Sequence, residues 1–283
     1  PSTPMVDDVY VIQQKYGADM TTRTGNTTYG FNSTADVTNS AMKFKVGEMA
    51  TLFTIWDANG TDTLDLSGYY TPSVIDLREG AYSSAGGLGS YNPALLGLDP
   101  AANKAAYLSA VNAYNAGEGL GARSGAYDLY FGGRAGVNEG VPWSKITNSV
   151  EANYLMQQNI GIAYGAIIEN AIGGFGNDRI NGNQANNSFT GGAGSDTFII
   201  ADYSGLIPTP SNPAGKNVVD TSIDTITDFT TGQDKIDLTS FGAGAVQNVI
   251  YTGGDLHFDA NGHSYTVHLL GASLNTTSDI LLG

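Results

Sequence analysis

The chain has 283 residues, which is enough for one large domain or two modest ones with a buried core. Its 12 basic and 27 acidic residues give a net charge of −15, which argues against nucleic acid or an anionic membrane as a partner and favours bound cations. No cysteine is present, so disulfides and thiolate metal sites are excluded, and no apolar run is long enough to predict a membrane span. The 38 glycines favour short strands and tight turns.

One amphipathic helix is predicted at the start of the chain, over residues 4–17. Apolar side chains recur there at helical spacing, acidic residues fall in the first turn and Gly17 ends the helix. The pattern then becomes that of short strands, which we expect at residues 27–31, 50–56 and 62–66. In the last of these, leucine alternates with aspartate, which predicts one buried face.

Residues 91–160 differ in character, because they are rich in Ala, Tyr and Gly, and we interpret them as an insertion between β coils. A helix with Asp99 as its N-cap is predicted inside this insertion. Further along, three prolines within residues 208–213 predict a loop. A final β portion is expected to begin at Asp224, and residues 249–270 alternate in the manner of hairpins.

The most informative motif is a nine-residue repeat within residues 173–198. Its intact copies begin at Gly173 and Gly191 and read Gly-Gly-x-Gly-x-Asp-x-apolar, with a degenerate copy between them. The glycines allow a tight turn with inward carbonyl groups, and the sixth position supplies the carboxylate of Asp178 or Asp196. The intact turns are eighteen residues apart, so they lie on one edge of a coil with two strands per turn, and each can donate half of a calcium shell. The sequence therefore predicts that calcium binding and folding are coupled.

The eighth position of each copy is apolar and is expected to face the core. It is occupied by Ile180, Phe189 and Phe198. A glycine-rich linker, which is the alternative interpretation, would show neither these phased apolar residues nor the phased aspartates.

The repeats resemble the calcium-binding nonapeptides of RTX proteins, and the chain resembles the serralysin family of secreted zinc metalloproteases. The resemblance covers nearly everything except the insertion. It is carried by residues 22–27, 29–32, 56–63, 168–174 and 224–238. It implies an all-β fold, namely a parallel, calcium-filled β-roll extended by a β-sandwich, with an N-terminal helix and a partly helical insertion.

The resemblance also implies a division of the chain. Residues 1–17 would be the terminal helix of a catalytic domain that is otherwise missing, and residues 18–90 a first β-roll and β-sandwich part. Residues 91–160 would be the insertion, residues 161–200 the repeats, and residues 201–283 a C-terminal β cap that carries a secretion signal.

Three sets of calcium ligands and one looser pair follow from the resemblance. The first set combines backbone oxygens of Arg23, Gly25 and Thr27 with Asp57, Asn59 and Asp62. The second combines Gly60 and Asp62 with the Ile167 carbonyl and the Glu169 carboxylate. The third places Gly174, Gly176 and Asp178 opposite Gly191, Ala193 and Asp196. The looser pair is Asp202 with Asp224, which resembles the family's closing pair of the roll.

These residue types suit the assignment, because calcium takes hard oxygen donors from turns and carboxylates. Asn187, in the degenerate copy, stands where an aspartate would be preferred. The alternative for all these acids is an ordinary role as solvated or capping side chains.

The catalytic motif of the family, His-Glu-x-x-His-x-x-Gly-x-x-His, does not occur in this sequence. The histidines are His257, His263 and His268, all in the C-terminal β region, where we expect them to be ordinary polar residues. No catalytic residue is therefore expected on this chain, and zinc is expected only on the missing catalytic domain. We interpret the chain as a piece of a zinc metalloendopeptidase.

An export signal is expected at the C-terminus. Residues 278–282 resemble the family's terminal acidic residue followed by apolar ones, although Gly283 follows them here. The expected partners are calcium ions, the family's catalytic protease domain and a type I secretion apparatus, without nucleic acid or membrane. The protein is expected to be an extracellular monomer.

The function expected is thus calcium-dependent folding, stabilisation and secretion of a serralysin-like protease. Two alternatives remain open, a polysaccharide lyase or epimerase and a surface adhesion or glycan-binding module. Both would use the tyrosine and arginine side chains of the insertion. The net charge of −15 argues against a polyanionic substrate.

Overall fold

The computed structural model describes the chain in several ranges. These are residues 1–35, 40–44, 51–69, 72–86, 156–203, 205–209, 212–218, 220 and 222–283. The predicted insertion with its helix therefore lies outside the described residues, except for residues 156–160. Among the described helices, none is long and apolar enough to cross a membrane.

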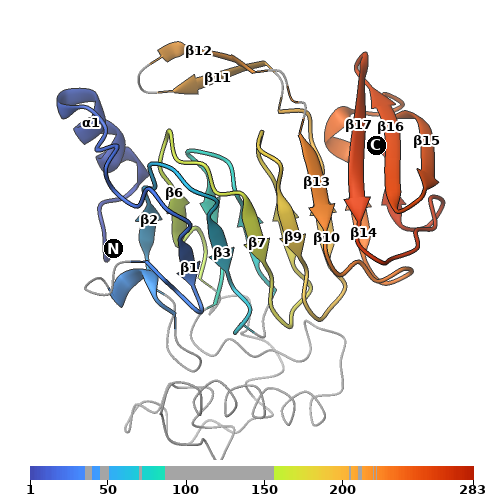
Figure 1. Cartoon of the computed structure of the whole chain (residues 1–283), viewed down its shortest axis with the longest axis horizontal. Helices are drawn as coiled ribbons and strands as arrows, with labels where there is room; N and C mark the ends of the chain where they lie inside the picture. Colours follow the sequence, from blue (N-terminus) through green and yellow to red (C-terminus); the bar gives the residue numbers. More distant parts are fainter. Residues whose placement is uncertain are drawn as a thin grey trace, which may run out of the picture.

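The N-terminal helix is confirmed as α1 (Val6–Tyr16). The backbone N–H of Met5 donates to Asp8 Oδ2 at 3.0 Å, which caps the first turn, and Gly17 follows the last turn. Val6 is buried, whereas Val11 is 60% exposed. The helix thus contacts the rest of the described chain mainly at its start, at one side of the molecule (Figure 1).

The strands of the described residues form four sheets. The largest has the order β1 (Thr28–Gly30), β3 (Thr63–Asp65), β7 (Asn170–Ile172), β9 (Ser188–Thr190), β13 (Ile223–Ile226), β17 (His263–Leu269), β16 (Asp255–Ala260), β15 (Gln247–Thr252). The second has the order β18 (Ile280–Leu281), β14 (Lys235–Asp237), β10 (Thr197–Ile199), β8 (Arg179–Asn181), β4 (Val74–Asp76). The third has the order β2 (Phe53–Ile55), β6 (Ile160–Ile162), β5 (Tyr82–Ser83), and the fourth pairs β11 (Gly205–Thr209) with β12 (Asn212–Val218).

Successive short strands alternate between the two larger sheets. The chain passes from β7 to β8, β9, β10, β13 and β14, and each strand pairs in parallel with its neighbour in its own sheet. The result is a coil with two strands per turn, whose front sheet lies across the centre of Figure 1. After β13 the front sheet continues with β17, and β16 and β15 then add antiparallel strands.

The core lies between these two sheets, because the middle residue of each three-residue strand points inward. In the front sheet the stacked residues are Leu64, Ala171 and Phe189, followed by Ile226 in β13, and in the second sheet they are Ile75, Ile180, Phe198 and Ile236. The rings of Phe189 and Phe198 stack across the core at 6.3 Å between centroids. The predicted inward positions of the repeats are therefore confirmed.

One expectation of local structure was wrong. Pro208 and Pro213 do not lie in a loop, because they fall within β11 and β12, which pair as a hairpin. Its register shifts between Ile207 and Thr209, so Pro208 falls at an irregularity where a missing N–H costs little. The predicted buried face of residues 62–66 is confirmed, since Leu64 and Leu66 are fully buried, and Asp62 and Asp65 are buried as well, at 1% and 3% exposed. The predicted hairpins of residues 249–270 are confirmed as β15–β16–β17.

Candidate metal centres

A row of carboxylates follows one edge of the second sheet, where each acid directly precedes a strand. Asp178, Asp196 and Asp234 precede β8, β10 and β14, and all three are 1–3% exposed. Each accepts a hydrogen bond from the residue at the same position of the preceding turn. The bonds run from Ser73 N to Asp178 Oδ1 (2.6 Å), from Asp178 N to Asp196 Oδ1 (2.8 Å) and from Asp196 N to Asp234 Oδ1 (2.9 Å). We call this row the first edge.

The front sheet has an equivalent row, the second edge, made of Thr27, Asp62, Glu169, Asn187 and Asp224. Thr27, Asp62, Glu169 and Asn187 each directly precede a strand, and Asp224, inside β13, directly precedes the stretch of β13 that pairs with β9. The bonds run from Thr27 N to Asp62 Oδ1 (2.7 Å), from Asp62 N to Glu169 Oε2 (2.7 Å) and from Asn187 N to Asp224 Oδ1 (3.0 Å). The structure therefore brings together acids that are far apart in the sequence.

A second bond recurs inside the turns, from a backbone N–H to the side chain four residues later. It joins Gly174 to Asp178 (2.6 Å), Asn183 to Asn187 (2.8 Å), Thr230 to Asp234 (2.7 Å) and Asn275 to Asp279 (3.0 Å). Two of these turns belong to the nine-residue repeats and two do not. The same turn geometry is thus built by sequences that share only the terminal Asp or Asn.

Glycine is required where consecutive turns of the first edge approach each other. Gly194 has φ +134°, and a Cβ there would lie 2.1 Å from the carbonyl oxygen of Gly176. The carbonyl of Gly174 accepts the N–H of Ala193 at 2.9 Å. Backbone carbonyls and the two carboxylates of the third predicted set therefore come together between these turns.

Two members of the first predicted set, Gly25 and Asp62, also lie close together, next to Gly60. Gly60 has φ +145°, and a Cβ there would lie 2.7 Å from the carbonyl oxygen of Gly25 and 2.8 Å from Asp62 Oδ1. Asp57 is 2% exposed and accepts the phenol of Tyr29 at 2.6 Å and the N–H of Asn59 at 3.2 Å. Oxygen atoms of the Gly25 turn and of Asp62 thus converge on Gly60, next to the bond that joins Asp62 to Glu169.

These carboxylates are held in surroundings that disfavour their charge. Burial, with the charges of Asp57 and Glu169, raises the pKa of Asp62 to about 7. Burial, with the charge of Asp196, raises the pKa of Asp178 to about 8. Burial, with the charges of Asp234 and Asp228, raises the pKa of Asp196 to about 7. Each of these sites would therefore be stabilised by a cation.

Basic side chains do not provide that cation. Among the residues that the structure describes, Lys and Arg form ion pairs with other acids, namely Arg78 with Asp76, Arg179 with Asp237 and Lys235 with Asp279. The described ranges also contain no group of three or more His, Cys, Asp or Glu side chains that could hold a metal ion by themselves. A metal at either edge would therefore need backbone carbonyl oxygens as well as carboxylates.

The two members of the looser predicted pair, Asp202 and Asp224, have different neighbours. Asp224 accepts the N–H of Asn187, and burial, with the charge of Asp220, raises its pKa to about 7. Asp202 lies beside Tyr265, whose pKa is raised by burial and by the charges of Asp202 and Asp220. The contacts thus connect Asp224 with the second edge, and Asp202 with the phenol of Tyr265.

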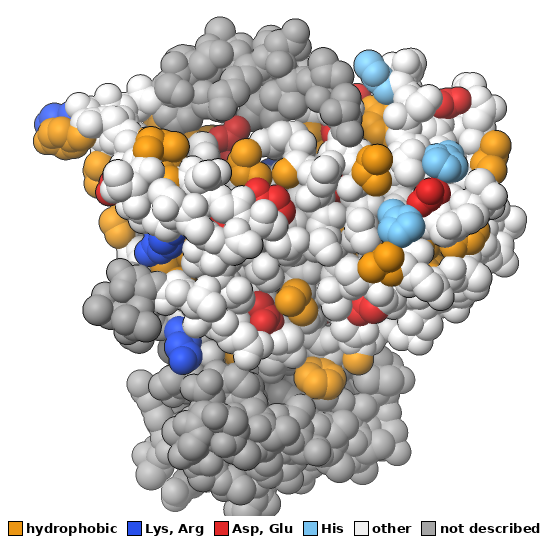
Figure 2. Space-filling view, in the orientation of Figure 1, with side chains coloured by type: hydrophobic (Ala, Val, Ile, Leu, Met, Phe, Trp, Pro, Cys, Tyr) orange, Lys and Arg blue, Asp and Glu red, His pale blue; other side chains and the backbone are white. Residues whose placement is uncertain are grey.

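The three histidines lie at the surface of the C-terminal strands, where Figure 2 shows them spread apart. His257 Nδ1 lies 3.0 Å from Thr266 Oγ1, and His268 pairs with Asp255 across adjacent strands. The contacts of His257 and His268 are those of polar residues on the outer face of a sheet.

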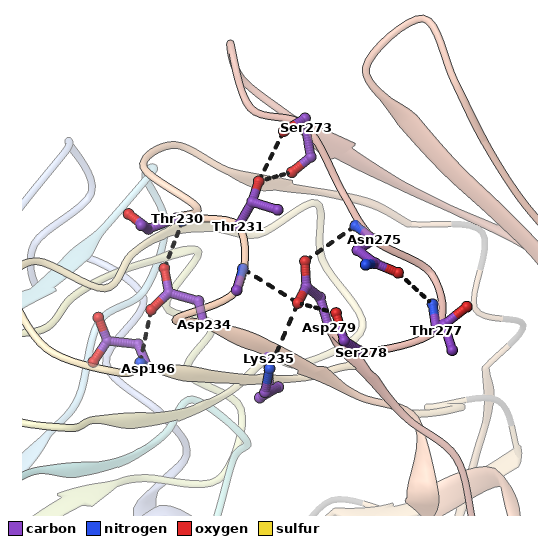
Figure 3. A network of polar contacts seen from close by, with 11 residues as sticks. Asp196, Thr230, Thr231, Asp234, Lys235, Ser273, Asn275, Thr277, Ser278 and Asp279 are labelled. Carbon is purple, nitrogen blue, oxygen red and sulfur yellow. Dashed lines mark hydrogen bonds and ion pairs between the residues drawn. The ribbon is translucent and has the colours of Figure 1, made fainter.

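Asp234 and Asp279 are functional candidates that the repeat motif did not reveal. Figure 3 shows Asp234 between Asp196 N and Thr230 N, and shows Asp279 with Asn275 and Lys235. Their turns lack the paired glycines of the repeat. One signal was present for Asp234, because a buried isoleucine follows it by two residues, as Ile180 follows Asp178.

The sequence profile of the family described as "Peptidase M10 serralysin C terminal" matches residues 18–93 and 153–278. The metalloprotease AprA of Pseudomonas entomophila is 31% identical over 259 residues, which cover 88% of this chain and 38% of that protein. Serralysin of Proteus mirabilis is 32% identical over 185 residues, or 65% of this chain and 23% of the relative. Serralysin B of Dickeya chrysanthemi is 50% identical over 90 residues, or 30% of this chain and 17% of the relative. The chain thus spans well under half the length of these relatives.

Proposed function

The chain belongs to the peptidase M10 serralysin C-terminal family, and from this membership we propose that it is a calcium-dependent folding, stabilising and type I secretion module. In this proposal it serves an extracellular zinc metalloprotease whose catalytic zinc lies on another domain. The names of the relatives, serralysin and metalloprotease, support the kind of parent protein. No step of peptide hydrolysis is assigned to residues of this chain.

The observation that carries the proposal is the row of buried carboxylates on the first edge. Asp178 and Asp196 lie in adjacent turns and have raised pKa values without a basic partner in the described residues. Two buried, neighbouring carboxylates at neutral pH require either protons or a cation. The surrounding oxygen donors are carboxylates and backbone carbonyls, which suit calcium rather than zinc or copper.

The residues of the three predicted sets would hold the ions. In the third set, Asp178 and Asp196 would face each other with the carbonyls of Gly174, Gly176, Gly191 and Ala193. In the first and second sets, Asp62 would be shared, because its carboxylate lies at Gly60 while its N–H is bonded to Glu169. Bound calcium would supply positive charge among these oxygens. Asp202 and Asp224 would be the closing pair of the resulting parallel β-roll.

Calcium would then decide whether the coil folds. The strands between the turns are only three or four residues long, so each contributes few hydrogen bonds and few inward side chains. Ionised carboxylates at adjacent turns repel each other and oppose the pairing of these strands. When calcium is scarce the chain is expected to stay expanded, as export requires, and it is expected to fold where calcium is plentiful.

The expected export signal, residues 278–282, has a place in the folded coil. Ile280 and Leu281 form β18, which pairs in parallel with β14, and Asp279 is fully buried. Leu281 and Leu282, by contrast, are 38% and 53% exposed. Folding would therefore bury only part of the proposed signal.

The test is the metal content of the chain after dialysis against calcium and brief desalting, measured by elemental mass spectrometry. Several calcium ions per chain and no zinc, with loss of β-sheet circular dichroism after chelation, would support the proposal. A chain that retains no calcium, or that keeps its fold in chelator at neutral pH, would overturn it. Bound zinc would reopen an enzyme function for this chain.

A further inference from the structure

The degenerate copy of the repeat differs from the intact copies at its polar positions. Asn187 stands where the intact copies have Asp178 and Asp196, and Asn183 stands where the first copy has Gly174. Both asparagines are 2% exposed, so their amides depend on protein partners. The turn that contains them, residues 182–187, follows the turn of Glu169 on the second edge.

The amide of Asn183 joins two neighbouring parts of the backbone. Its Nδ2 donates to the carbonyl oxygen of Leu77 at 3.0 Å and to that of Ile168 at 2.9 Å. Its Oδ1 accepts the N–H of Ala185 at 2.9 Å. The side chain thus reaches carbonyl oxygens of the preceding turn, which is the kind of group that a calcium ion would otherwise collect.

The amide of Asn187 completes the contact. Its Nδ2 donates to the carbonyl oxygen of Glu169 at 3.2 Å and to Asn183 Oδ1 at 3.0 Å, and its Oδ1 accepts the N–H of Asn183 at 2.8 Å. The two side chains together donate to three backbone carbonyls and leave none of their own polar atoms without a partner.

Asp178 provides the matched comparison. It accepts the N–H of Gly174 just as Asn187 accepts that of Asn183, at 2.6 Å against 2.8 Å. As a carboxylate it has no N–H to donate to the carbonyls of the neighbouring turn, whereas Asn187 has two. The same turn therefore either requires a cation or has its carbonyl groups paired by protein amides, and the choice depends on the residues at positions 183 and 187.

We propose that Asn183 and Asn187 take the place of a calcium ion, so that the coil is closed between the turn of Glu169 and residues 182–187 without metal. This inference rests on the calcium-dependent function proposed above, because it concerns which intervals of the coil use the ion. The degenerate copy would then form a metal-independent joint on the second edge, next to the turn of Glu169. Loss of the Asn183 amide would then weaken the fold equally with and without calcium.

The experiment measures the melting temperature of the full chain over a range of free calcium, from chelator to saturation. The slope of the melting temperature against the logarithm of calcium concentration reports ions taken up on folding. We expect Asn183→Ala to lower the melting temperature by about 4–10 °C at every calcium concentration, because buried carbonyls lose their donor. We expect Asp196→Asn, at a proposed calcium ligand, to reduce the slope itself.

A second variant tests the inference if Asn183→Ala does not fold. Asn187→Asp removes the donor and adds a carboxylate next to Glu169 and Asp224, so it should lower stability in chelator and steepen the calcium slope. If Asn183→Ala reduced the slope as Asp196→Asn does, or Asn187→Asp left the slope unchanged, the inference would be wrong. A wild-type chain with no calcium slope at all would instead overturn the proposed function, so the two failures can be told apart.

Discussion

The backbone N–H of Asp178 donates to the carboxylate of Asp196 at 2.8 Å, so these two residues, one repeat pair apart, lie directly next to each other in adjacent turns. The bond orients the Asp196 carboxylate but does not neutralise it, because a single neutral donor cannot replace a cation. Under the proposed function, this contact is one reason to expect a coil that is more stable with calcium than without it.

The first prediction concerns Asp196→Asn. Asparagine can keep the Oδ1 bond to Asp178 N while it removes the buried charge. In chelator at neutral pH we expect a melting temperature equal to or higher than that of the wild type. In saturating calcium we expect it to be lower by about 4–8 °C, since about 2 kcal/mol of ion binding would be lost. Thermal unfolding followed by circular dichroism measures both values.

Asp7→Asn is the control for that variant, because Asp7 is an exposed residue in the first turn of α1. It should change both melting temperatures by less than about 2 °C. Equal destabilisation by Asp196→Asn in chelator and in calcium would argue against a metal at this pair.

The second prediction is the pH dependence of the metal-free chain. Carboxyl groups of the unfolded chain ionise near pH 4, whereas the pKa of Asp196 is about 7 and that of Asp178 about 8 in the fold. Folding therefore favours their protonated forms. The stability they contribute is fully present below about pH 4 and is lost as the pH rises toward 8.

Asp279 affects the pH dependence of stability in the opposite direction, and over a more acidic pH range. Burial raises the pKa of Asp279, but hydrogen bonds from Asn275, Ser278 and Gly232 and the charge of Lys235 hold it below its ordinary value, so its contribution is lost only in acid. Between pH 5 and 8 in chelator we thus expect the melting temperature to fall by about 5 °C or more with rising pH. Calcium should abolish or reverse this trend, and a chelated chain that is most stable at pH 8 would contradict the prediction.

Some of this site could be predicted from the sequence, because the repeat fixes local geometry. The inward positions of Ile180 and Phe198 follow from the spacing, and so does the alignment of Asp178 with Asp196. The contact of Ser73 with Asp178 could not be predicted in this way, since 105 residues separate them and only tertiary pairing of β4 with β8 joins them. Contacts between residues so far apart cannot be recognised from the local sequence.

The buried amides show a second limit of sequence interpretation. The degenerate copy looked like a weakened metal half-site, with Asn187 as a poor substitute for aspartate. Whether Asn183 reaches the carbonyls of Leu77 and Ile168 depends on how closely three separate segments pack, which the repeat does not encode. The hairpin β11–β12 was missed for a related reason, because proline disfavours strands in general but is tolerated at an irregular position.

The third prediction concerns Gly194, where two adjacent turns of the coil approach each other closely. Gly194→Ala would place a Cβ 2.1 Å from the carbonyl oxygen of Gly176 at φ +134°, so adjacent turns would have to separate. We expect the free energy of unfolding to fall by about 3 kcal/mol or more, and calcium to stabilise the variant less than it stabilises the wild type. Gly253→Ala is the matched control, because it also has a positive φ but no atom within 4 Å of the added Cβ.

Gly253→Ala should lower the free energy of unfolding by only about 1 kcal/mol, because of the strain of its backbone conformation. It should leave the stabilisation by calcium unchanged. Denaturant unfolding with and without calcium compares the two variants. Similar losses for both would mean that backbone strain, rather than the approach of the two turns, explains the effect of Gly194→Ala.

The last prediction concerns the ion pair at the end of the coil. Lys235 Nζ lies 3.5 Å from Asp279 Oδ1, and Asp279 is fully buried whereas the Lys235 side chain is 30% exposed. Lys235→Met would keep the aliphatic packing and leave Asp279 without a cation. We therefore expect the free energy of unfolding to fall by about 1–3 kcal/mol. Because a lysine here provides the positive charge that calcium would provide between Asp178 and Asp196, the loss should be the same in chelator and in calcium. Lys15→Met, at the exposed end of α1, is the control and should be nearly neutral. A loss confined to one calcium condition would show that the final turn also depends on the metal.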